Sequence, residues 1–151
     1  MFTRHTALAR RYADALTAAG VRAVHFTRSL SEEVRNAEKW RFQTDDAVRA
    51  IVIDLKNAEG IDGLQVARRV VFSEPLSCSD TAKRVQAISR CDRMGQERPV
   101  IVRTLAMRGT AEERIASYVP QARPAAANRR VREAGTTLAR RQLRAYLGII
   151  A

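Results

Sequence analysis

A glutamine and two arginines recur at helical spacing in the second half of the chain. Gln86, Arg90 and Arg93 are separated by four and then three residues, and on an α-helix these offsets place them within an arc of about 60°. The small or apolar Ala87 and Ile88 lie between them and can pack against a sheet. Two guanidiniums on one stripe suit the binding of a phosphate oxyanion, because each offers several N–H donors. The alternative, for the two arginines alone, is a solvated basic face on an arginine-rich chain.

The residues that follow extend this pattern at fixed spacing. They include Gly95 and Gln96, then Pro99 and Val100 at the start of a predicted strand, then Gly109, Thr110, Glu112, Glu113 and Ile115 where a helix is predicted to begin. The whole set resembles motif VI, with the strand and helix after it, of the Swi/Snf-type branch of the superfamily 2 helicase-like ATPases. The resemblance implies that Arg90 and Arg93 are catalytic arginine fingers for the γ-phosphate of ATP, and that Gln86 positions them.

Two earlier segments extend the resemblance over roughly residues 1–118. Residues 2–5, Phe-Thr-Arg-His, resemble motif IV, and residues 54–75 resemble motif V with its following strand, allowing a one-residue gap before Glu59. The resemblance implies that Gly60 and Asp62 bind the nucleotide cofactor. It also implies that Arg4 and Lys56 contact nucleic acid.

The motif V segment departs from the family pattern. Asn57 and Ala58 stand where the family has a glycine pair, and Asp54 stands where it has a serine. An aspartate repels the phosphate that a hydroxyl would bind, which argues against that contact. Gly60 and Gly63 fit a plain turn as well as they fit a nucleotide-coupling role.

Composition indicates one folded domain with a basic surface. The chain has 151 residues, 46% of them hydrophobic, and a formal net charge of +11. Such a charge attracts nucleic acid through the release of counterions. Cys78 and Cys91 do not have the spacing of a zinc site, and no apolar run is long enough to cross a membrane. We therefore expect an intracellular protein, nuclear in a eukaryote and otherwise cytoplasmic or viral.

Strands and helices are predicted to alternate along residues 1–119. The predicted strands are 1–3, 21–26, 50–55, 69–73 and 100–105; the predicted helices are 6–19, 31–42, one that starts after Ser79 or Asp80 and carries Gln86, Arg90 and Arg93, and 110–118. This order indicates an α/β fold with a parallel sheet flanked by helices, and the family resemblance implies a RecA-like sheet. Trp40 is expected in the core. Residues 120–151 form an Arg/Ala-rich tail, with a helix predicted over 131–147.

The sequence lacks the parts that hold ATP in this superfamily. It contains no phosphate loop of the form Gly-x-x-x-x-Gly-Lys-(Ser/Thr) and no Asp-Glu pair for magnesium. The resemblance therefore implies ATP and Mg²⁺ as cofactors only with a first lobe from elsewhere. The expected partners are double-stranded DNA and a first lobe, supplied by another chain or by a missing N-terminal part of the same protein. The alternative is a non-enzymatic, basic nucleic-acid-binding remnant of such a helicase.

Overall fold

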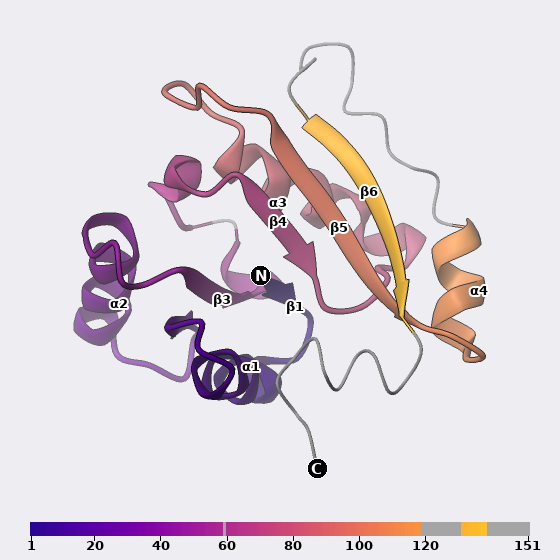
Figure 1. Ribbon diagram of the computed structural model, residues 1–151, viewed down its shortest axis with the longest axis horizontal. Helices are drawn as coiled ribbons and strands as arrows, with labels where there is room; N and C mark the ends of the chain where they lie inside the picture. The colour runs from indigo at the N-terminus through magenta and orange to yellow at the C-terminus, as the bar shows by residue number, and fades with distance from the viewer. Residues whose placement is uncertain (59, 119–130, 139–151) are drawn as a thin grey trace.

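The computed structural model describes residues 1–58 and 60–118, together with the strand 131–138 (Figure 1). The strands are β1 (Phe2–Thr3), β2 (Ala23–Phe26), β3 (Ala50–Asp54), β4 (Arg69–Phe72), β5 (Val100–Met107) and β6 (Val131–Leu138). The helices are α1 (Thr6–Ala18), α2 (Glu32–Thr44), α3 (Thr81–Cys91) and α4 (Ala111–Tyr118), with short 3-10 turns η1 (Leu55–Asn57), η2 (Leu64–Val66) and η3 (Cys78–Asp80). No helix in these described ranges is long and apolar enough to cross a membrane.

The six strands form one sheet in the order β2-β3-β1-β4-β5-β6, and all the described pairings are parallel. Parallel neighbours need crossover connections, and α1, α2 and α3 supply them. All strands therefore end at the same side of the sheet, which we call the carboxyl edge, and begin at the opposite amino edge. The predicted α/β class, with a parallel sheet flanked by helices, is confirmed.

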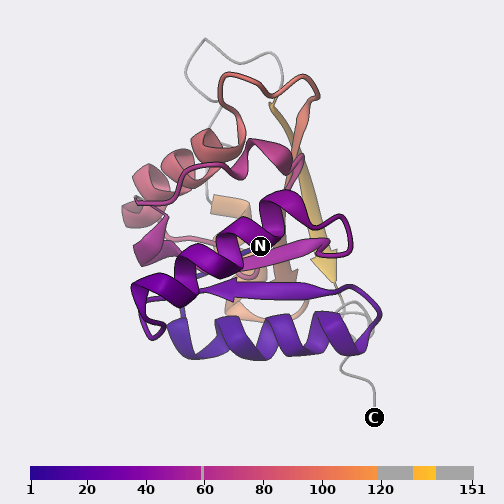
Figure 2. The same ribbon diagram turned by 90° about the vertical axis from the view of Figure 1, so that its left-hand side faces the viewer.

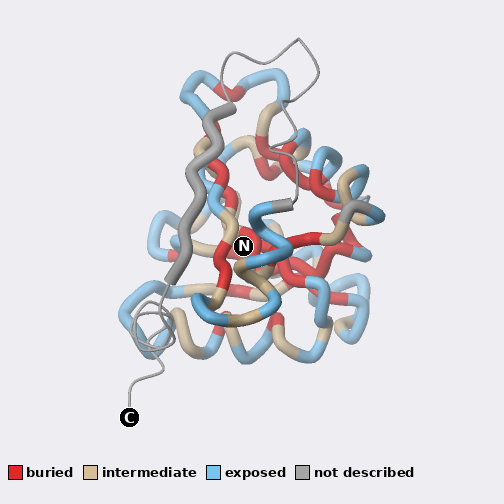
Figure 3. The backbone as a smooth tube through the Cα atoms, turned by 90° about the vertical axis from the view of Figure 1, so that its right-hand side faces the viewer, coloured by how far each residue is buried: buried red, intermediate tan, exposed pale blue. Residues whose placement is uncertain are grey.

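Apolar side chains of the central strands fill both faces of the sheet. Along β3, Ile51 and Ile53 point to one face and Val52 to the other, because side chains alternate along a strand. α1 packs on Val52 through Ala9 and Ala13 and lies alongside β2 (Figure 2). α3 packs on the other face through Ala87, Ile88 and Cys91. Buried positions gather in the middle of the molecule, between exposed outer turns (Figure 3).

Capping groups visible in the sequence account for two of the helix starts. Ser31 accepts a hydrogen bond from the backbone N–H of Val34 at 3.4 Å at the start of α2. At the start of α4, Glu112 accepts a hydrogen bond from the backbone N–H of Met107 at 2.8 Å, and its negative charge lies in the first turn of the helix. α3 is different, because Asp80 stands at the N-cap position without a side-chain cap bond.

The C-terminal segment differs from the prediction. The helix predicted from residue 131 is wrong for Val131–Leu138, which forms β6 and pairs in parallel along the whole of β5. Valine and threonine at 131, 136 and 137 favour strands. Without β6, β5 would also leave a row of backbone groups unpaired. The remainder of the predicted helix, residues 139–147, lies outside the described residues.

Trp40 is not in the core, contrary to the prediction. Its side chain is 64% exposed on α2. The neighbouring Phe42 packs against the core cluster, and residues two apart on a helix lie about 200° around the axis from each other. α2 therefore turns Trp40 to solvent as it turns Phe42 inward.

Candidate functional site

Arg90 and Arg93 converge on one carboxylate oxygen. Nη1 of Arg90 lies 2.9 Å from Oδ1 of Asp62, and Nη1 of Arg93 donates to the same oxygen. The side chain of Arg90 is 23% exposed and that of Arg93 is 50% exposed, so solvent reaches both. Two guanidiniums directed at one point form an anion-binding pair. In this structure the anion is the protein's own carboxylate.

The loop that presents Asp62 is fixed from the protein side. Ile61 is fully buried beneath it. Gln43 on α2 donates from Nε2 to the backbone oxygens of Gly63 at 3.1 Å and Asp62 at 3.5 Å. Gly63 has a φ of 85°, in the left-handed region that favours glycine. The backbone at Asp62 is thus held, while its carboxylate stays at the surface.

The predicted stripe of Gln86, Arg90 and Arg93 is not carried by one helix. α3 ends at Cys91, so Arg93 lies in the following loop. Gln86 is exposed on α3, one turn before Arg90. The loop brings Arg93 back beside Arg90, and the two guanidiniums therefore meet at Asp62 instead of along a helical edge. Gly60 is exposed in a plain turn, with its N–H donating to the backbone oxygen of Asn57 at 3.3 Å.

A buried glutamine fixes the end of this loop. Gln96, 6% exposed, donates from Nε2 to the backbone oxygens of Gln65 at 2.8 Å, Ala67 at 3.0 Å and Cys91 at 3.3 Å. These oxygens belong to η2, the approach to β4 and the end of α3. Gln96 therefore ties the arginine-bearing loop to the segment that follows Asp62. The motif match identified Gln96 in the sequence but did not reveal this bracing role.

The aspartate that replaces the family's serine is structural. Asp54 is fully buried. Its Oδ2 accepts a hydrogen bond from Oγ1 of Thr6 at 3.0 Å, and its Oδ1 accepts the backbone N–H of Asn57 at 2.9 Å, which caps η1. The carboxylate is satisfied inside the protein and does not face a phosphate. The repulsion expected at this position therefore does not arise.

Arg28 is a candidate residue that the sequence did not single out. It follows β2, and its Nε donates to Oδ1 of Asn57 at 3.2 Å. Asn57 is 8% exposed, and its Nδ2 is the one buried side-chain polar atom without a hydrogen-bond partner among the described residues. Lys56 beside it is exposed. Two cations close together are suited to a phosphate group. In a chain this rich in arginine, no local signal distinguishes Arg28.

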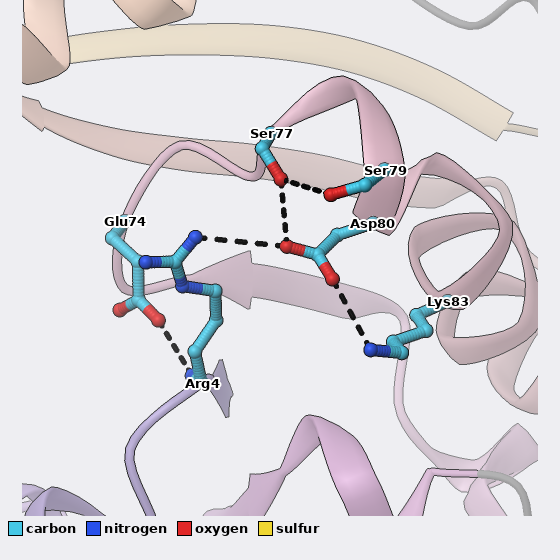
Figure 4. A network of polar contacts seen from close by, with 6 residues as sticks. All are labelled: Arg4, Glu74, Ser77, Ser79, Asp80 and Lys83. Atoms are coloured by element: carbon cyan, nitrogen blue, oxygen red, sulfur yellow. Dashed lines mark hydrogen bonds and ion pairs between the residues drawn. The ribbon is translucent and has the colours of Figure 1, made fainter.

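Arg4 lies within a polar network that joins β1 to the start of α3 (Figure 4). Its Nη1 is 3.6 Å from Oδ2 of Asp80, and its backbone N–H donates to Glu74. Asp80 also accepts hydrogen bonds from Ser77 at 2.9 Å and Lys83 at 3.2 Å. Partial burial acts to raise the pKa of Asp80, but the bond from Ser77 and the positive charges of Lys83 and Arg4 together hold that pKa below its ordinary value. Asp80 is thereby kept ionised, and Arg4 is held in place.

These residues lie at two different edges of the sheet. Arg4, Arg28 and Lys56 follow β1, β2 and β3, so they lie at the carboxyl edge. Asp62 precedes β4 and Arg93 precedes β5, so the arginine pair lies towards the amino edge. The segment between Lys56 and Asp62 joins the two groups.

The chain is similar in sequence to segments of much longer proteins. No protein-family model matches the chain. It is 40% identical over 54% of its length to F-box protein At3g54460 of Arabidopsis thaliana, and 33% identical over 76% of its length to DNA repair protein rad8 of Schizosaccharomyces pombe. It is also 30% identical over 64% of its length to an uncharacterized ATP-dependent helicase of S. pombe. It spans 6%, 10% and 9% of these proteins, respectively.

A solved structure has the same fold. The C-terminal part of the Fun30 ATPase domain superposes with a TM-score of 0.66 at 20% sequence identity, over 77% of this chain and 36% of that one. The chain therefore has the fold of the C-terminal part of the Fun30 ATPase domain, and its sequence is similar to segments of a DNA repair protein and of an ATP-dependent helicase.

Proposed function

We propose that this lobe is the second half of an ATP-dependent motor that moves on double-stranded DNA. Arg90 and Arg93 meet the γ-phosphate of an ATP molecule held by a first lobe. The convergence of both guanidiniums on Asp62 carries this proposal, because it shows that the pair can bind a single anionic oxygen. A γ-phosphate presents oxygens of the same kind with more charge.

Asp62 then acts as an internal stand-in for the phosphate. Its side chain is 67% exposed, so an incoming anion can displace it without opening the core. It keeps the two like-charged guanidiniums together while no nucleotide is present. Gln86, exposed one turn away on α3, positions the arginines when the first lobe closes on them.

The carboxyl-edge cluster, which we define as Arg4, Arg28, Lys56 and Asn57, is the proposed track for the DNA backbone. Cationic side chains there neutralise phosphates irrespective of sequence. DNA repair protein rad8, one of the similar proteins, has a name that ties it to DNA. The short segment from this cluster to Asp62 would couple DNA movement to the state of the arginine pair.

ATP and Mg²⁺ are bound chiefly by the first lobe in this proposal. When bound, they supply the phosphoryl group and its charge-neutralising metal ion. The residues of this chain contribute positive charge at the γ-phosphate from outside the phosphate pocket. An arginine finger of this kind accelerates hydrolysis by roughly three to five orders of magnitude. Without a first lobe, the chain is expected to be inactive as an ATPase.

The test is to join the chain to the phosphate-loop lobe of a similar helicase. ATP hydrolysis is measured for the first lobe alone, for this chain alone and for the joined protein, each with and without duplex DNA. Hydrolysis that needs both lobes and is stimulated by DNA is the expected result. A correctly folded joined protein that binds DNA but shows no turnover above the first lobe alone would contradict the motor.

A second function is a non-enzymatic DNA- or RNA-binding remnant. The departures at Asp54, Asn57 and Ala58 from the family pattern favour it, and a chain with a net charge of +11 attracts nucleic acid without any nucleotide. In the joined protein, salt-sensitive binding of nucleic acid without any effect of ATP supports this alternative.

A further inference from the structure

Asp54 carries a carboxyl group in the interior of the protein, at the end of β3. The residue is 0% exposed, and burying a polar group is costly unless its hydrogen bonds are satisfied. Its two oxygens are bonded in different directions. Oδ2 accepts from the hydroxyl of Thr6 on α1 at 3.0 Å, and Oδ1 accepts from the backbone N–H of Asn57 at 2.9 Å. Asp54 therefore joins the first turn of α1 to the short turn η1.

The turn η1 presents two acceptors to one guanidinium. Nε of Arg28 donates to Oδ1 of Asn57 at 3.2 Å, and Nη2 of Arg28 donates to the backbone oxygen of Lys56 at 3.5 Å. Nε and Nη2 lie on one edge of the planar guanidinium, so this edge faces the protein. Because Asp54 caps η1 at the N–H of Asn57, the positions of both acceptors depend on the carboxyl group of Asp54.

The other edge of the Arg28 guanidinium is available to a ligand. A guanidinium has five N–H groups, and the two bonds to η1 leave three of them without a partner in the part of the chain that the structure describes. One of these on Nη1 and one on Nη2 form a fork that matches two oxygens of a phosphate group. Arg28 is exposed, and so is Lys56 on η1. One phosphate group can therefore accept two hydrogen bonds from Arg28 beside the positive charge of Lys56.

We propose that Arg28 and Lys56 form a binding site for one phosphate group of a nucleic-acid backbone, and that Asp54 is a positioning residue for this site. Asp54 does not touch the phosphate. It fixes η1, and η1 fixes which edge of the Arg28 guanidinium stays open. Holding this fork in place before binding reduces the entropy that is lost when the phosphate binds. The inference rests on the proposed DNA track, and it adds the buried residue that orients one of the track's cations.

Two substitutions at Asp54 distinguish positioning from a purely structural role. Asp54→Asn and Asp54→Ala remove the same negative charge, so they change the general attraction for DNA equally. Asparagine keeps an oxygen for the N–H of Asn57 and an amide group that donates to the hydroxyl of Thr6, whereas alanine loses both bonds. Binding of the full chain to a short fluorescent DNA duplex is measured at several salt concentrations. The measurement needs no first lobe, so its outcome does not depend on the ATPase result.

Asp54→Ala is expected to bind the duplex several-fold more weakly than Asp54→Asn. The slope of its log affinity against log salt concentration should be smaller by about one, the value for one lost phosphate contact. When Arg28→Ala is also present, the two Asp54 variants should bind equally, because the group through which Asp54 acts is gone. Gln96→Ala is the matched control, since it removes internal hydrogen bonds away from the carboxyl edge and should leave the slope unchanged.

Equal affinities and slopes for Asp54→Ala and Asp54→Asn would overturn the inference, and weaker binding by Arg28→Ala would then leave the DNA track standing. Unchanged binding by Arg28→Ala would refute the track at this position and the inference with it. If Asp54→Ala does not fold, Asn57→Ala takes its place, because it removes the acceptor for Nε of Arg28 and keeps the N–H that Asp54 caps. Its slope should also fall by about one, and an unchanged slope would overturn the inference.

Discussion

The carboxylate of Asp62 is bonded to the guanidinium of Arg93, 31 residues further along the chain, and Arg90 shares the same oxygen. The pairing joins the motif V segment to the motif VI loop. Because Asp62 and Arg93 are both at least half exposed, solvent screens the pair and its contribution to stability is small. The pairing matters because it holds the positive charges of Arg90 and Arg93 beside one negative charge at the surface.

Replacing Asp62 should expose the anion-binding capacity of this pair. We expect Asp62→Asn to bind inorganic pyrophosphate several-fold more tightly than the unmodified chain, because the competing carboxylate charge is removed. Calorimetry at two salt concentrations measures this. The control is Asp14→Asn, which removes the partner of Arg10 on α1 and should have no effect. Equal affinity for all three proteins would show that Asp62 does not mask an anion site.

Gln96 should contribute to stability and not to chemistry. In Gln96→Ala, three backbone oxygens, one of them in a buried bond and two in part-buried bonds, lose the donor they share. The expected loss is about 1–3 kcal/mol of unfolding free energy, since each buried acceptor left unpaired is costly. The exposed Gln86→Ala should change stability by less than about 0.5 kcal/mol. Urea unfolding of both variants distinguishes them, and equal midpoints would contradict the bracing role.

Alanine substitutions at Gly63 and Gly20 distinguish the cost of a left-handed backbone from the cost of a steric clash. Their φ angles are nearly equal, 85° and 84°. A Cβ atom at Gly63 would meet the side-chain amide of Gln43, whereas at Gly20 it meets nothing within 4 Å. Both alanine variants incur the left-handed penalty of roughly 1 kcal/mol, and Gly63→Ala additionally disrupts the bond that fixes the Asp62 loop. We expect Gly63→Ala to be the less stable in thermal unfolding; the reverse order would contradict the role given to Gln43.

The amino group of Met1 should make stability depend on pH. Burial lowers its pKa from 8.0 to about 6, with a smaller opposing effect of Cys91. Below pH 6 the amino group is charged in both states, and burying that charge destabilises the folded state. Between pH 6 and 8 the folded protein has released the proton while the unfolded chain still holds it. Above pH 8 the amino group is neutral in both states, and the cost of burying a charge is absent. Stability should therefore rise by up to roughly 3 kcal/mol between pH 6 and 8. An acetylated amino terminus should abolish this rise, and an unchanged pH profile after acetylation would contradict the assignment.

Local sequence signals predicted most of the sheet and its helices. The apolar run at 50–55 and the cap at Ser31 depend on neighbouring residues in the sequence. The strand and the helix start could therefore be predicted from the sequence alone. β6 and Trp40 depend on long-range packing instead. The edge of β5 decides the conformation of Val131–Leu138, and the position of α2 decides which side of that helix is exposed.

The candidate site was predicted only in part, because its geometry also depends on long-range packing. Motif spacing singled out Arg90, Arg93 and Asp62 but assigned Asp62 to the cofactor, because nothing local indicates that the loops fold onto each other. Helical periodicity placed Arg93 on α3, although the helix ends two residues earlier. The inward turn of Asp54 depends on Thr6, which is 48 residues away. Contacts at such separations have no signature in a single sequence.

The most direct test of the proposed motor is the ATPase rate of the joined two-lobe protein carrying Arg93→Ala. The matched control is Arg10→Ala, which also removes an arginine from an exposed pair with an aspartate, but on α1. We predict that Arg93→Ala lowers the rate by about three orders of magnitude or more while DNA affinity is kept, and that Arg10→Ala leaves both unchanged. Full turnover by the Arg93 variant would contradict the assignment of the arginine pair to the γ-phosphate.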